Sequence, residues 1–116
     1  MKLKEIIERC NLRVFTPEVN FEDIDITGGY TSDLLSDVMA ACEAGSIWVT
    51  IQRHLNIVAV AKLKEIPAIL ITRGLVPEKS TIEKAQAEGV VLLGTGLNSF
   101  EATGKIYCLL KGIKGA

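Results

Sequence analysis

Hydrophobic and polar residues follow two patterns along the chain, one typical of amphipathic helices and one typical of buried strands. Leu3, Ile6, Ile7 and Cys10 recur at helical spacing and predict a short helix near the start. Short runs rich in Ile, Val and Leu follow at intervals, and such runs are typical of strands that are buried on both faces. The predicted strands are residues 13–15, 24–26, 47–51, 68–72 and 90–93.

Helix start and stop signals lie between these strands. Thr31 or Ser32 is expected to cap a helix that carries Asp33 in its first turn, and Ser80 with Glu83 has the spacing of a capping box. Glycines 45 and 89 and the cap pair Asn98 and Glu101 supply further boundaries. The predicted helices are residues 3–10, 31–42, 54–65, 80–89 and 98–111.

Residues 54–65 allow two interpretations. The apolar run 57–61 has the composition of a strand, but Asn56 can cap a helix and the charged end of the segment is typical of a solvated last turn. We therefore predict a helix. The tail, residues 112–116, is expected to fray.

Strands that alternate with helices at this spacing require right-handed crossovers and a parallel sheet. With 116 residues, 48% of them hydrophobic and only 5% aromatic, the chain is long enough for one aliphatic core. The expected fold class is α/β, a single three-layer domain over residues 1–116 with a mainly parallel sheet flanked by helices.

Charge and hydropathy exclude several classes of partner. The formal net charge is −1 and the basic residues are scattered, so the electrostatic footprint of a nucleic-acid-binding protein is missing. The longest apolar run, residues 66–71, is far shorter than the roughly 20 residues of a membrane span. Without a signal region behind its charged first residues, the chain is expected to be cytoplasmic.

No catalytic or metal-binding constellation is found, and no cofactor is expected. Cys10, Cys42 and Cys108 lie far apart and are expected to be reduced core thiols. His54 is the only histidine and has no predictable partner for acid–base chemistry. Residues 94–99 begin like a dinucleotide fingerprint, but they lack its third glycine, and no Walker loop exists.

Polar turns follow four of the predicted strands, three of these turns contain glycine, and in a parallel sheet all four are expected to share one edge. Glycines let backbone amides approach a ligand, helix N-termini add partial positive charge, and arginine pairs with phosphate or carboxylate. An anionic small molecule or nucleotide is the expected guest, although tight turns need the same residue types for geometry alone. The candidate ligand-binding residues are Thr27, Gly28, Gly29, Arg53, Thr72, Arg73, Gly74, Thr95, Gly96, Asn98 and Thr103.

The last predicted helix is apolar over most of its circumference. One row contains Phe100, Thr103, Tyr107 and Leu110, and a second apolar row runs beside it. A helix of this kind is deeply buried or covered by a partner, and in a small domain the expected partner is a second copy of the chain. Gly104 costs roughly 1 kcal/mol in mid-helix, which fits a close approach by another backbone.

Three segments carry a family resemblance: residues 25–29 (Asp-Ile-Thr-Gly-Gly), residues 68–74 (Ala-Ile-Leu-Ile-Thr-Arg-Gly) and residues 98–103 (Asn-Ser-Phe-Glu-Ala-Thr). Together they make the chain resemble a DRTGG domain over nearly its whole length. Ile26 replaces the arginine of the name motif, and Arg73 stands where relatives usually carry a further glycine.

DRTGG domains are found appended to phosphate acetyltransferases and to pyrophosphatases with CBS modules, and a related form begins HPr kinase. The resemblance implies a non-catalytic regulatory module, α/β in fold and homodimeric, that acts on a partner enzyme. One hypothesis is a homodimer that senses an anionic metabolite or nucleotide. The alternative is a purely structural dimerisation or docking module without a small-molecule ligand, and a small enzyme of unknown reaction is a third.

Overall fold

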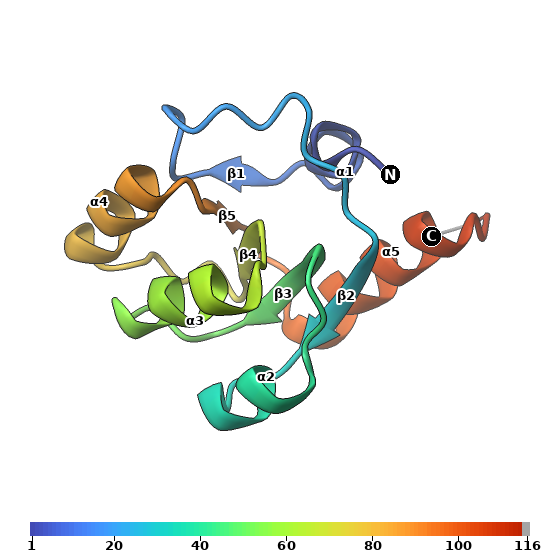
Figure 1. The fold of residues 1–116 in the computed structure, drawn as a ribbon. Helices are drawn as coiled ribbons and strands as arrows, with labels where there is room; N and C mark the ends of the chain where they lie inside the picture. Colours follow the sequence, from blue (N-terminus) through green and yellow to red (C-terminus); the bar gives the residue numbers. More distant parts are fainter. Residues whose placement is uncertain (115–116) are drawn as a thin grey trace.

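The computed structural model describes residues 1–114, and the last two residues of the predicted tail lie outside that range. Helices and strands alternate along most of the chain, as predicted (Figure 1). The helices are α1 (Leu3–Cys10), α2 (Leu35–Ala41), α3 (Asn56–Lys64), α4 (Lys79–Glu88) and α5 (Ser99–Lys111). The strands are β1 (Arg13–Val14), β2 (Gly28–Thr31), β3 (Ser46–Thr50), β4 (Ala68–Ile71) and β5 (Val91–Gly94).

The strands form one sheet in the order β1-β5-β4-β3-β2. Strands β2 to β5 are parallel to one another, and only the two-residue β1 runs antiparallel, beside β5. This arrangement confirms the α/β class with a mainly parallel sheet. Strand β2 is the far edge of the sheet, and helix α5 lies alongside it (Figure 1).

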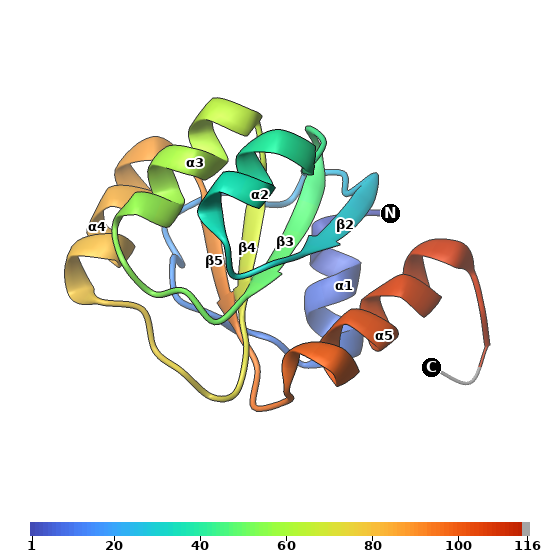
Figure 2. The same ribbon diagram turned by 90° about the horizontal axis from the view of Figure 1, so that it is seen from below.

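Helices cover both faces of the sheet, which gives the three predicted layers. Helices α2, α3 and α4 lie on one face and α1 and α5 on the other (Figure 2). Trp48 is fully buried in the first core, where its indole N–H donates to the carbonyl of Ser32 over 2.8 Å. In the part of the chain that the structure describes, no helix is long and apolar enough to span a bilayer.

The segment at residues 24–26 is not a strand of the sheet, which corrects the prediction. Its backbone pairs instead with the start of the chain: Ile24 accepts from the amide of Leu3, and the amide of Ile26 donates to the carbonyl of Met1. The side chain of Ile26 is buried in the core beside α1 and α5. The apolar pattern therefore reported burial correctly, but a partner far away in sequence determined the pairing.

The predicted helix caps have mixed outcomes. Asn98 caps α5, since its side-chain oxygen accepts from the amide of Glu101 over 2.9 Å, as predicted. The predicted caps at Thr31 or Ser32, Asn56 and Ser80 are wrong. The N-cap residues of α2, α3 and α4 are Leu34, Leu55 and Glu78, and none of them makes a side-chain cap hydrogen bond. The helix predicted over residues 54–65 is confirmed, as α3, over Asn56–Lys64.

Candidate functional site

A groove runs between the edge strand β2 and helix α5. It consists of two adjoining hollows of about 270 and 500 Å³, which share Gly29, Tyr107 and Leu110 in their walls. Cavities of this size lie in the range that small-molecule ligands occupy. The wider hollow includes Thr27 and Gly28, and the narrower one includes Thr103. The groove thus joins the paired glycines of β2 to the last resemblance segment, and we call it the β2–α5 groove.

Gly29 explains why the groove is open. It lies in register with Ile47, and Thr31 lies in register with Val49; both of these β3 side chains belong to the core on the α5 side of the sheet. Because side chains alternate along a strand, Gly29 also faces α5. Where a larger residue would fill the space between sheet and helix, Gly29 leaves it empty.

The fold itself does not require glycine at either position. Neither Gly28 nor Gly29 has a positive φ. A Cβ at Gly28 would lie 3.5 Å from the Ser46 hydroxyl, and one at Gly29 would lie 3.7 Å from Ile47, both ordinary contacts. Glycine inside a strand often marks a place where a ligand or another backbone approaches closely. The paired glycines of this edge strand fit that interpretation.

The walls of the groove are mainly apolar, with a few polar groups. Thr31 and Thr103 share a hydroxyl–hydroxyl hydrogen bond of 2.7 Å that ties β2 to α5. Lys111 lines the wider hollow, and its ammonium lies 5.8 Å from the centroid of the Tyr107 ring. The groove therefore combines an aromatic wall, aliphatic side chains and a positive charge at one end.

Thr27, Gly28 and Gly29 do not share an edge with the other predicted turns, which corrects the sequence-based placement. They lie at the beginning of β2, whereas the other turns follow the ends of β3, β4 and β5, and these strands are parallel. The glycines are thus at the opposite end of the sheet. The candidates that do meet at the carboxyl edge are Arg53, Thr72, Arg73, Gly74, Thr95, Gly96 and Asn98.

Most polar groups of the carboxyl edge bind one another. The amides of Arg73 and Gly74 donate to the carbonyls of Leu97 and Thr95 over 2.7 and 2.8 Å. Thr72 is buried, and its hydroxyl shares a 2.7 Å hydrogen bond with Ser99. A smaller cavity of about 170 Å³ remains there, lined in part by Gly74, Thr95, Gly96 and Arg13. This edge has fewer free polar groups than the sequence indicated.

The loop around Arg53 is also engaged within the chain. The carbonyl of Arg53 accepts from the Thr81 hydroxyl over 2.8 Å, and its guanidinium donates to Val76 over 3.5 Å. His54 has a carboxylate partner after all, since its Nδ1 lies 2.8 Å from Glu78. Both side chains of that pair are largely exposed, which is typical of a surface contact joining two loops.

Asp33 has a role that the sequence did not reveal. Its carboxylate accepts hydrogen bonds from the Thr50 hydroxyl and the Ile51 amide, each over 2.9 Å. It therefore holds the end of β3 to the connection after β2, rather than complementing the start of a helix.

The three thiols are free, with Cys42 buried and Cys10 and Cys108 partly exposed. Burial raises the pKa of Cys42 and that of Cys10 above the ordinary thiol value, which keeps both in the less reactive thiol form. Within residues 1–114, no cluster of three His, Cys, Asp or Glu side chains is placed to hold a metal ion.

Tyr107 and Leu110 are groove residues that sequence reasoning did not assign to a binding site. Their spacing with Thr103 is visible as an apolar row, which predicts a helix that is deeply buried or covered by a partner. Only the packing of α5 against β2 shows that one side of the row lines a hollow.

Comparison with known proteins places the fold. No family model matches the chain, and no curated protein matches it. Among solved structures, it is similar to the CBS and DRTGG regulatory region of a Clostridium perfringens pyrophosphatase, determined with the activator diadenosine tetraphosphate. The TM-score is 0.68 over 89% of this chain, at 16% sequence identity. The chain has a DRTGG-like fold.

The DRTGG-like chain corresponds to 44% of that regulatory region, and the resemblance seen in the sequence is confirmed at the level of the fold. At 16% sequence identity the comparison supports the fold rather than the role of any single residue. The groove must therefore be interpreted from its own geometry.

Proposed function

We propose that this DRTGG-like domain is a non-catalytic regulatory module that binds a nucleotide-type anion in the β2–α5 groove. The observation that carries the proposal is the pair of glycines, Gly28 and Gly29, which neither backbone conformation nor internal packing requires. The groove beside them has an aromatic wall at Tyr107 for a planar base and Lys111 for a phosphate. The solved regulatory region of similar fold has a nucleotide activator.

The regulatory part of the proposal concerns what the bound ligand changes. We expect the domain to act as a homodimer and to pass its ligand state to a partner enzyme. Because the groove lies between an edge strand and a helix, a ligand that contacts both would alter how firmly α5 is held against β2. A change in the position or mobility of α5 is then what a partner would detect.

The test is a thermal-shift and calorimetry screen with mononucleotides, diadenosine polyphosphates, acyl phosphates and CoA esters. A ligand at about 1,000 times its dissociation constant should stabilise the fold by roughly 4 kcal/mol. No thermal shift with any of these compounds would contradict the proposal and favour the structural docking module.

Two matched glycine variants locate the site. Gly29→Leu places a side chain in the β2–α5 groove, and Gly96→Leu places one beside the cavity at the carboxyl edge. Both glycines are exposed, neither has a positive φ, and a Cβ at either position makes no close contact. Ligand binding should be lost in Gly29→Leu and kept in Gly96→Leu. The reverse result would move the site to the carboxyl edge.

A further inference from the structure

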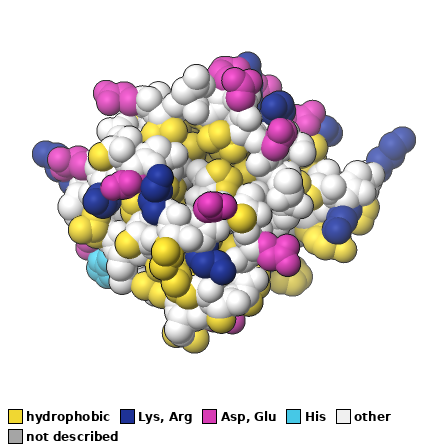
Figure 3. Space-filling model, in the orientation of Figure 1, with side chains coloured by type: hydrophobic (Ala, Val, Ile, Leu, Met, Phe, Trp, Pro, Cys, Tyr) yellow, Lys and Arg dark blue, Asp and Glu magenta, His cyan; other side chains and the backbone are white. Residues whose placement is uncertain are grey.

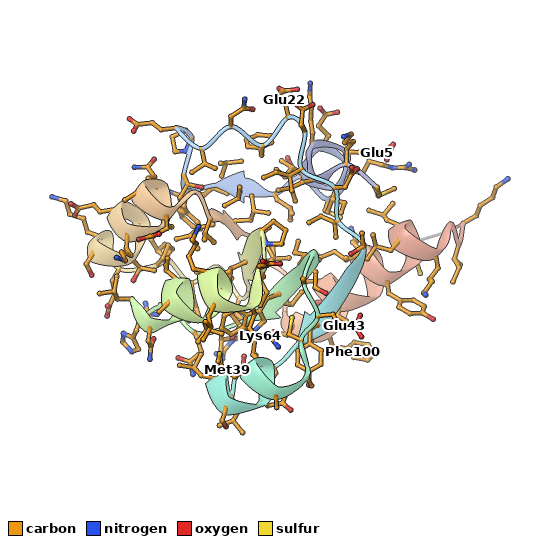
Figure 4. All side chains as sticks on the ribbon, viewed as in Figure 1. Glu5, Glu22, Met39, Glu43, Lys64 and Phe100 are labelled. Carbon is orange, nitrogen blue, oxygen red and sulfur yellow. The ribbon has the colours of Figure 1, made fainter. Side chains whose placement is uncertain are left out.

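The outward face of α5 has the composition of an interface rather than of a solvated surface. Ala102 and Ile106 are buried and define the inward side of the helix. Gly104 lies two residues from each, about 200° around the helix axis, and so occupies the middle of the outward side. Its flanks include Phe100, 88% exposed, and Tyr107, 55% exposed. Phe100 projects outward from the start of α5 (Figure 4).

Neither the backbone conformation nor the packing of the described chain requires glycine at position 104. Its φ is not positive, and a Cβ built there would find nothing within 4 Å. Glycine in a helix interior costs roughly 1 kcal/mol against alanine, and packing or function is the usual reason to keep it. Close packing against another backbone is one such reason. In the described part of the chain no segment makes that approach.

We infer that the outward face of α5 packs against the same face of a second copy of this chain, with the two helices antiparallel across a two-fold axis. Phe100 and Gly104 are one helical turn apart on this face. The large ring of Phe100 projects from the helix, and Gly104, which has no side chain, leaves a notch beside it. A two-fold axis midway between them places each Phe100 over the partner's Gly104. The surface is therefore complementary to itself in shape, as a two-fold interface requires.

The charges on this face favour the same arrangement. Glu101 and Lys105 are exposed, and neither takes part in an ion pair among the described residues. In the antiparallel pairing, Glu101 of one helix lies on the same flank as the partner's Lys105, so opposite charges meet twice. A parallel pairing would instead place these residues of the two helices on opposite flanks of the interface, where they could not pair.

Figure 3 shows hydrophobic side chains on the side of the molecule where α5 lies, as well as on other parts of this view. Since Tyr107 belongs both to this face and to the wall of the β2–α5 groove, the partner helix would narrow the groove mouth. The inference rests on the homodimer of the proposed function but not on its ligand. It can therefore succeed where ligand binding fails.

Sedimentation equilibrium over a concentration series tests the inference. The unmodified chain should dimerise, and Phe100→Glu should weaken the dimer by at least about thirtyfold, the effect of losing an interface hot spot. Gly104→Leu should weaken it similarly while raising the melting temperature of the monomer, because Leu favours helix more than Gly does. That combination separates loss of the interface from loss of the fold.

Two further variants complete the design. Leu63→Glu changes an apolar side chain that is 70% exposed on α3, on the other face of the sheet, and should leave dimerisation unchanged. Glu101→Lys should weaken the dimer, and adding Lys105→Glu should restore it. A monomer at all concentrations, or a dimer indifferent to Phe100→Glu and Gly104→Leu, would overturn the inference. Thermal shifts measured on the same variants would report ligand binding separately.

Discussion

At the scale of single residues, Arg73 is a departure from the DRTGG motif that the sequence resembles, and this departure is visible in the backbone. It has a φ of 63° and precedes Gly74, with a φ of 67°, in a turn closed by the amide of Leu75 on the carbonyl of Thr72. A turn with two consecutive positive φ values favours glycine or asparagine at both positions. The further glycine that the DRTGG resemblance leads one to expect at this position would therefore have a conformational reason.

We predict that Arg73→Gly stabilises the domain. A residue other than glycine in the left-handed region carries a strain of about 1–2 kcal/mol, which Arg73→Gly would relieve. Glycine is more flexible in the unfolded chain, and ordering it on folding offsets part of this gain. A net gain of about 0.5–1 kcal/mol is expected from chemical denaturation. Gly74→Ala is the matched control, and it should lose about 1 kcal/mol through backbone strain, since its Cβ meets nothing within 4 Å. Destabilisation by Arg73→Gly would mean that the arginine makes contacts that offset its strain.

At the scale of elements, strand β2 differs from the strands inside the sheet because its glycines do not serve packing. Gly94 at the end of β5 is the contrast. A Cβ there would lie 2.6 Å from one carbon of the Phe15 ring and 2.9 Å from another, so the ring rests directly on the glycine. One strand therefore needs its glycine for the core, while the other keeps two glycines at an exposed edge.

This difference predicts opposite effects of the same substitution. Gly29→Ala should be neutral or stabilise the fold by up to about 0.5–1 kcal/mol, because alanine loses less conformational freedom in a strand. Gly94→Ala should destabilise it by about 1–3 kcal/mol through overpacking against Phe15. Urea denaturation of both variants measures the two free energies of unfolding. If Gly29→Ala were as damaging as Gly94→Ala, the glycine of β2 would serve folding and would no longer indicate a site.

The elements also show how far sequence reasoning reaches. Local signals were sufficient where the determining contact is local, as for the Asn98 cap or the helix at Asn56–Lys64. They failed where the partner is distant: residues 24–26 pair with the chain start, and His54 meets Glu78 from another loop. Two of the predicted candidates, Gly29 and Thr103, line the same groove, but the sequence grouped them with other residues, since only the packing of α5 on β2 brings these two together.

At the scale of the whole molecule, two hydrophobic cores share one sheet. Trp48 belongs to the core under α2, α3 and α4, and Ile47 next to it belongs to the core under α1 and α5. Adjacent residues of the same strand contribute to the two cores on opposite faces of the sheet. If one core unfolds, the strands that support the other core are therefore exposed to solvent. The sheet should therefore couple the two layers of helices into one cooperative unit.

We predict a single unfolding transition. The fluorescence of Trp48, the one tryptophan, reports the first core, and far-ultraviolet circular dichroism reports all five helices. Under a urea gradient the two signals should change together, and calorimetry should give an unfolding enthalpy of about 80 kcal/mol near 60 °C for a chain of this length. Ala68→Asp, in the core on the α1 and α5 side, should shift both transitions equally. Loss of the dichroism signal at lower urea than the fluorescence signal would show instead that α1 and α5 detach first. Helices α1 and α5 would then form a less stable layer that unfolds on its own, and a ligand or partner would control its docking without unfolding the rest.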